Sequence, residues 1–133
     1  MEARELSIGN LVMANVANDI IQLRVDEILW FDHLGYTLRM WVGKNRESKI
    51  DLPLHSAEPI PLTDELLLRC GLDKVGLFYV SKDAPPRPFR FLLGKVEGYC
   101  YIEYRQRIVK IMYLHQLQNI YFSLTGKELD VTL

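Results

Sequence analysis

The sequence predicts an α+β fold in which two short helices pack on a mostly antiparallel sheet. Several short segments alternate apolar and polar residues with the period of a β-strand. Only residues 63–70 and 114–125 combine helical signals with helix end signals. Glycine and proline recur between the segments at intervals that suit short strands. The N-terminal half has enough strands to curl toward a small barrel, and that alternative stays open.

The N-terminal half predicts a run of strands joined by short turns. The first strand follows the turn at Gly9 and Asn10, and the second occupies residues 20–28. In the second strand, and again in residues 36–42, apolar residues alternate with polar ones, so one face of each strand is expected to be buried. The short segment KIDL, residues 49–52, follows a polar turn.

Two adjacent acidic residues, Asp26 and Glu27, lie within the second predicted strand. Successive side chains of a regular strand point to opposite faces of the sheet. We therefore expect these two carboxylates to be unable to act together on one substrate.

The first helix is predicted after a connector, residues 53–62, that contains three prolines. Thr63 is placed to cap the helix, and Asp64 and Glu65 in its first turn complement the helix dipole. Gly71 is placed to end it, so the helix is expected over residues 63–70.

The C-terminal half predicts further strands before the last helix. Residues 75–80 (VGLFYV) are expected to form one strand, and residues 81–88 a loop. Residues 89–104 are expected to form a hairpin that turns near Glu97 and Gly98. A strand over residues 108–113 then leads directly into the helix.

Length and composition predict one globular domain, residues 1–133, because 49% of the 133 residues are hydrophobic. No apolar run is long enough to cross a bilayer, and the first residues lack the pattern of a signal peptide, so we expect a cytoplasmic protein with no membrane partner. Cys70 and Cys100 lie among apolar neighbours and are expected to be reduced. The histidines show no zinc-ligand spacing, and we expect no metal and no cofactor.

Charge is almost balanced over the chain, with a net charge of −1, but it is unevenly distributed. Residues 87–112 hold six basic and two acidic residues, a local excess of four positive charges, and aromatic residues lie between them. Aromatic rings and arginines on a sheet can stack on and hold single strands of nucleic acid. The candidate contacts for this alternative function are Arg87, Arg90, Arg105, Arg107 and Lys110.

The last helix has an unusual polar face, because residues 113–126 (YLHQLQNIYFSLTG) contain no charged residue. Its apolar residues fall on one arc, which predicts a helix over residues 114–125 packed on the sheet. The opposite face is either open to water or covered by another segment of the chain, such as residues 127–133, or by a second subunit, since covered surfaces are depleted in charge. Four residues of this face are the candidate partner surface: His115, Gln116, Asn119 and Ser123.

This C-terminal stretch also resembles a known group of sequences. YLHQLQNIYFSLTGKEL is similar to the C-terminal signature of small uncharacterised proteins encoded in prophages and other mobile elements of gut anaerobic bacteria. ELSIGNLVM and EPIPLTDELLLRCGLDKVG resemble the same group, in the same order along the chain. The resemblance implies an accessory protein of a mobile element, and it implies no activity.

The leading functional hypothesis is therefore a non-enzymatic accessory protein that acts by protein–protein contact, with self-association as one form of that contact. No phosphate-binding loop, dinucleotide fingerprint or nucleophile elbow occurs in the sequence, so no catalytic residue is assigned. The alternative hypothesis is a nucleic-acid-binding module that uses residues 87–112.

Overall fold

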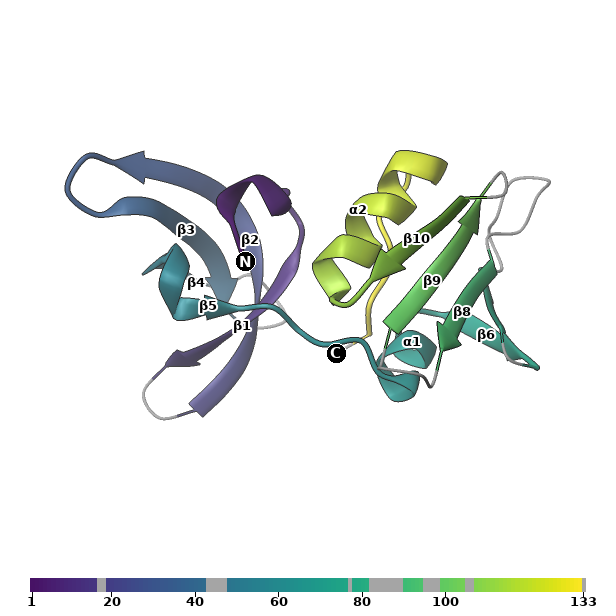
Figure 1. Ribbon diagram of the computed structural model, residues 1–133. Coiled ribbons are helices and arrows are strands. Elements are labelled where there is room, and N and C mark those ends of the chain that lie inside the picture. Colours follow the sequence, from purple (N-terminus) through teal and green to yellow (C-terminus); the bar gives the residue numbers. More distant parts are fainter. Residues whose placement is uncertain are drawn as a thin grey trace. The chain divides into compact units, whose positions relative to one another are not determined.

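The computed structural model describes residues 1–16, 19–42, 48–76, 78–81, 90–94, 99–104 and 107–132 (Figure 1). These residues form two compact units: unit 1 contains residues 1–60 and 114–119, and unit 2 contains residues 61–113 and 120–133. Each unit has its own antiparallel sheet, and the two helices complete an α+β fold, as the sequence predicts. That all 133 residues fold as one domain stays a prediction.

The sheet of unit 1 has five antiparallel strands in the order β4-β3-β2-β1-β5. Two short 3₁₀ helices, Ala3–Glu5 and Leu54–Ser56, precede β1 and β5. The described strands do not close into a barrel, because β4 and β5 lie at the two edges of the sheet. The strands are β1 (Leu11–Val16), β2 (Asp19–Phe31), β3 (Gly35–Val42), β4 (Ser48–Pro53) and β5 (Ala57–Glu58).

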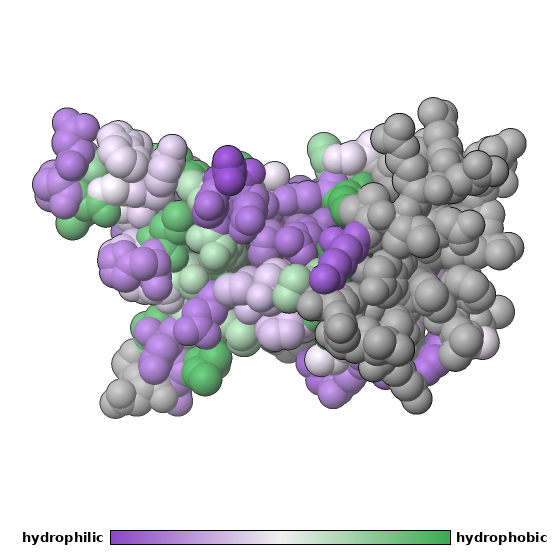
Figure 2. All heavy atoms as spheres, viewed as in Figure 1, coloured by the Kyte–Doolittle hydropathy of each residue, from purple (hydrophilic) through white to green (hydrophobic). Residues whose placement is uncertain are grey.

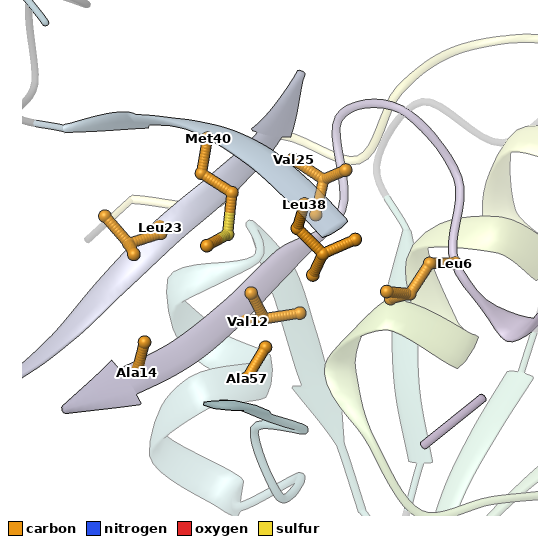
Figure 3. Close-up of a cluster of buried hydrophobic side chains, with 8 residues drawn as sticks. All are labelled: Leu6, Val12, Ala14, Leu23, Val25, Leu38, Met40 and Ala57. Atoms are coloured by element: carbon orange, nitrogen blue, oxygen red, sulfur yellow. The ribbon is translucent and has the colours of Figure 1, made fainter. Parts of the chain in front are cut away.

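One face of this sheet carries the hydrophobic core of unit 1. The alternating apolar residues of β2 and β3 point to this face, as predicted, and the same face of β1 packs beside them (Figure 3). Leu6 of the N-terminal segment adds a further buried side chain. The buried cluster consists of Leu6, Val12, Ala14, Leu23, Val25, Leu38, Met40 and Ala57.

A β-bulge in β2 changes which side chains face the core. Val25 pairs with Met40 and Glu27 pairs with Arg39, so Asp26 is one extra residue on its strand. The expectation that Asp26 and Glu27 point to opposite faces is wrong. Carboxylate oxygens of both residues approach Nζ of Lys49, at 2.9 Å and 4.0 Å respectively.

The sheet of unit 2 also has five antiparallel strands, in the order β10-β9-β8-β7-β6. The single strand expected over residues 75–80 is wrong, because Gly76 has a φ of 64° and turns the chain between β6 and β7. The hairpin over residues 89–104 is confirmed by the pairing of β8 with β9, although its turn lies outside the described residues. The strands are β6 (Leu72–Val75), β7 (Phe78–Ser81), β8 (Arg90–Gly94), β9 (Tyr99–Tyr104) and β10 (Arg107–Ile111).

Both predicted helices are present, as α1 (Asp64–Arg69) and α2 (Leu114–Thr125). Thr63 caps α1, since its Oγ1 accepts a hydrogen bond of 3.1 Å from the Leu66 N–H. Gly71 follows α1 with a φ of 73°, a conformation that glycine adopts without strain. No helix in the described part of the chain is long and apolar enough to span a membrane.

The first cysteine lies just after α1. Cys70 is buried and not in a disulfide, and burial raises the pKa of its thiol to about 12. Such a thiol stays protonated at neutral pH and is a poor nucleophile. Cys100 is placed in β9, and its side chain lies outside the described part of the structure.

Truncation of Leu38 should reveal the stability that the core of unit 1 provides. Leu38 is 0% exposed, so Leu38→Ala should lower the free energy of unfolding by about 2 to 5 kcal/mol, the usual cost of emptying a core site. Chemical denaturation measures this change. The control is Ile20→Thr, because Ile20 is 74% exposed and its loss should cost less than about 0.5 kcal/mol. Equal effects of the two substitutions would contradict the described core.

Candidate functional site

The predicted partner surface on α2 does not lie on one open face. His115 is fully buried, so its expected place on the outward face of the helix is wrong. Gln116 and Asn119 are half-buried, and Ser123 is exposed. The physical reason is that the first part of α2 packs with the N-terminal segment of unit 1 instead of facing water.

Three amide side chains, Asn10, Gln118 and Asn119, bind the N-terminal segment to α2, and we call them the amide clamp. The Leu11 N–H donates to Oε1 of Gln118 at 2.9 Å, while Nε2 of Gln118 donates to the carbonyl oxygen of Gly9 at 3.3 Å. Nδ2 of Asn10 donates to Oδ1 of Asn119 at 2.9 Å. Asn119 in turn donates to the carbonyl oxygen of Glu5 at 2.9 Å.

The amide clamp explains why this end of the helix carries no charge. A side-chain amide offers both a donor and an acceptor, which is what an N–H and a carbonyl of the covering backbone require. A lysine or glutamate at the same place would be desolvated without a partner of opposite charge. Residues 5–11 therefore cover this part of the helix, so the covering chain segment that the sequence allowed is N-terminal, whereas cover by a second subunit stays a prediction.

The basic residues proposed for nucleic-acid contact are only partly described. Arg87 and Arg105 lie outside the described residues, while Arg90 and Arg107 are placed in β8 and β10 by their backbones alone. Lys110 is exposed on β10, where the strand register sets it opposite Tyr101. A shared surface of these five residues stays a prediction.

The outer face of unit 1's sheet carries a network of charged side chains, which we call the charged ladder: Asp26, Glu27, Arg39, Lys49 and Asp51. Arg39 donates two hydrogen bonds, of 2.8 and 3.0 Å, to the two carboxylate oxygens of Asp51. A third N–H group of Arg39 approaches Glu27 at 3.3 Å. The hydrogen bond from Arg39 holds the pKa of the Asp51 carboxyl below its usual range.

Lys49, the second cation of the charged ladder, also has close partners. Nζ of Lys49 lies 2.9 Å from Asp26 and 4.4 Å from the centre of the Trp41 ring. The indole N–H of Trp41 donates to the other oxygen of Asp26 at 3.0 Å. Both cations are thus occupied by carboxylates of their own sheet, which makes the ladder a cross-strand brace.

Large apolar side chains are exposed where β2 turns into β3, and we call this patch of four residues the hairpin tip. Trp30 is 61% exposed, Phe31 37%, Leu34 56% and Tyr36 47%. Trp30 and Tyr36 are directly paired across the hairpin, with their ring centres 4.8 Å apart in an edge-to-face arrangement. The hairpin loop projects past the ends of the neighbouring strands (Figure 1), and apolar residues are exposed beside hydrophilic ones there (Figure 2).

The strand register explains why part of this patch is apolar. On β3, Tyr36 follows the buried residues Met40 and Leu38 along the same face of the strand, and on β2 Trp30 follows the partly buried Ile28. The core-facing side of the sheet therefore continues past the last residues that the rest of unit 1 covers. Gly35, with a φ of 72°, makes the turn that brings the two strands together.

The sequence patterns did not predict the hairpin tip. The second strand was expected to end at residue 28, which left Trp30 and Phe31 in a connection, whereas β2 continues to Phe31. The available signal was the stretch LWFDHLGY, residues 29–36, in which large apolar residues flank a turn instead of the polar residues usual there. Among the side chains that the structure describes, no cluster of three or more His, Cys, Asp or Glu is arranged to hold a metal.

Replacing one buried member of the amide clamp should destabilise unit 1. Gln118→Leu removes the acceptor of the Leu11 N–H and the donor to Gly9, so it should lower the free energy of unfolding by about 1 to 3 kcal/mol. Chemical denaturation measures the loss. Gln22→Leu is the matched control, because Gln22 is exposed on β2 and its replacement should have little effect. A neutral Gln118→Leu variant would show that the clamp contributes nothing to stability.

The burial of His115 should make stability fall as the pH falls. Burial lowers the pKa of His115, although the nearby Glu5 carboxylate acts in the opposite direction. The unfolded chain, in which histidine has a pKa of about 6.5, then binds a proton that the folded chain does not. Stability should therefore be constant above that value and decrease below it, down to the lower pKa of the folded state.

Denaturation curves between about pH 7.5 and about pH 5 test this dependence on the histidine, whose unperturbed pKa lies within that window. His115→Gln removes the titrating group, so the variant should lose less stability than the parent over the same interval. Carboxylates that titrate at the acidic end affect both proteins alike. Parallel curves for parent and variant would mean that His115 is not held in its neutral form.

Comparison with known proteins identifies no relative of this chain. No family model matches it, and neither a curated protein nor a solved structure is similar to it. The resemblance of its C-terminal stretch to prophage and mobile-element proteins stays a prediction.

Proposed function

We propose that this chain is a non-enzymatic module that binds another protein, and that the hairpin tip is its contact surface. In line with the sequence resemblance, we propose that the chain acts through this contact as an accessory protein of a prophage or other mobile element. The observation that carries it is the exposure of Trp30, Phe31, Leu34 and Tyr36 together at one hairpin turn.

The size of the patch supports a functional role. An aromatic side chain buries about 150 to 250 Å², and with a similar area for Leu34 the four side chains at their exposed fractions offer roughly 400 Å² over the two sides of the hairpin. The largest exposed apolar patch of a typical monomer is about 300 to 600 Å² and is often functional. Tryptophan and tyrosine are also the residues that most often dominate the binding energy of protein interfaces.

The surroundings of the patch support a protein partner over a nucleic acid. Asp32 and the charged ladder together hold four carboxylates and two cations, which leaves a local net charge of −2. A phosphate backbone would be repelled by these carboxylates, and it needs cations for its affinity. The charged ladder links β2, β3 and β4 below the tip, and these cross-strand contacts favour one arrangement of the hairpin that presents the aromatic side chains.

A nucleic-acid-binding role through residues 87–112 is the second candidate. It is favoured by the exposed Lys110 on β10 and by the strand register, which sets Lys110 opposite Tyr101 and Arg107 opposite Tyr104. Basic and aromatic positions thus meet across one pair of strands. The two candidates use different units, so one experiment can separate them.

Site-specific photo-cross-linking tests the proposed contact surface. A photoreactive phenylalanine analogue in place of Leu34 should give protein adducts in an extract of cells that carry the gene, and nuclease treatment should not remove them. The control places the same analogue at Ile20, which is 74% exposed at another hairpin of unit 1, and should give no specific adduct.

Removing Trp30 should abolish these adducts. Trp30→Ala in the Leu34-labelled protein should reduce them more than tenfold, as expected for an anchor whose loss costs about 2 kcal/mol or more. Adducts that form equally at both labelled positions, or that survive Trp30→Ala, would contradict a contact at the hairpin tip. Adducts that disappear with nuclease would support the second candidate instead.

A further inference from the structure

We infer that the partner of the hairpin tip is a different protein with an apolar pocket rimmed by lysine or arginine, and that a second copy of this chain does not fill this role. The inference rests on the proposed function and specifies the chemistry of its partner. Three features of the described residues support it: the area of the patch, its convex position, and the charge around it.

The area of the hairpin tip is too small for a symmetric dimer. A stable interface of standard size buries about 800 Å² on each partner, whereas the four exposed side chains offer roughly 400 Å². Two copies that met tip to tip would bury too little surface to remain associated. A partner that surrounds the tip would also cover the flanks of the hairpin and so reach a sufficient area.

The position of the side chains requires a concave partner. Trp30 and Tyr36 lie on the core-facing side of the hairpin, while Phe31 is the next residue on β2 and therefore points to the opposite side. Apolar groups are thus exposed on both sides of one turn. A flat surface could cover only one of these sides, but a pocket can accept the whole turn.

The negative charge around the hairpin tip favours a partner whose pocket is surrounded by lysine or arginine. Asp32 is exposed between Phe31 and Leu34, and the charged ladder lies below it on the same two strands and on β4. The ladder has three carboxylates and two cations, and each cation already contacts two carboxylates. The hairpin therefore presents excess negative charge beside its apolar tip, which complements cationic residues and repels anionic ones.

Selection from a random peptide library displayed on phage tests this chemistry without a known partner. The immobilised full chain serves as bait, and binders that also recognise the Trp30→Ala variant are discarded. The remaining peptides should carry large apolar residues together with an excess of lysine or arginine. A synthetic copy of a selected peptide should bind at least threefold more weakly when salt is raised from about 0.05 M to about 0.5 M, because salt screens the attraction between exposed charges.

Reversing the charge at the tip gives a sharper measurement. Asp32→Lys should weaken binding of the selected peptide at least threefold. Asp19→Lys is the matched control, because Asp19 is exposed at the start of β2, and it should leave the affinity nearly unchanged. Peptides that require Trp30 but have no basic excess, or that ignore Asp32→Lys, would overturn the basic rim and leave the proposed function intact.

Other occupants of the tip give different results. If sedimentation shows a dimer that Trp30→Ala converts to a monomer, the inference that the partner is a different protein would be overturned. Binding to vesicles of phosphatidylcholine with one quarter phosphatidylglycerol, if it requires Trp30 while no selected peptide does, would overturn both this inference and the proposed function. Binding of single-stranded DNA that requires Trp30, when no selected peptide requires Trp30, would also overturn both this inference and the proposed function.

Discussion

The register between β2 and β3 is the constraint on which the rest of unit 1 depends. Antiparallel pairing fixes which residues share a face, and the single extra residue at Asp26 shifts that assignment midway along the hairpin. Before the bulge, Leu23 and Val25 face the core, and after it Ile28 and Trp30 occupy the same side. Without the bulge, Glu27 would share the side of Val25 and would have to be buried or displaced.

This register also determines what the surface can do. It gathers Glu27, Arg39 and Asp51 in one row across three strands, where they brace the hairpin from the outer face. On the other face it carries the apolar row past the end of the core to the exposed pair of Trp30 and Tyr36. This braced hairpin with an uncovered apolar end is the contact surface that we propose, because a surface that is ordered before binding loses little conformational entropy when a partner covers it.

The N-terminal segment has a different role, which is to cover the uncharged first part of α2. Its turn around Gly9 leaves N–H and carbonyl groups that the sheet does not pair, and the amides of Gln118 and Asn119 satisfy several of them. The absence of charge in the first part of α2 is thus explained by an interaction within unit 1.

The sequence by itself determined the elements whose signals are local. Apolar alternation located β2 and β3, and Thr63 and Gly71 bounded α1, because strand periodicity and helix caps act over a few residues. Tertiary structure decided what depends on distant partners. The burial of His115 depends on the N-terminal segment, more than a hundred residues away in the chain, and the exposure of Trp30 depends on where the cover of the core ends. The residue pattern within one segment cannot predict the burial of His115 or the exposure of Trp30. Whether a side chain is buried depends on the distant residues that tertiary packing brings next to it.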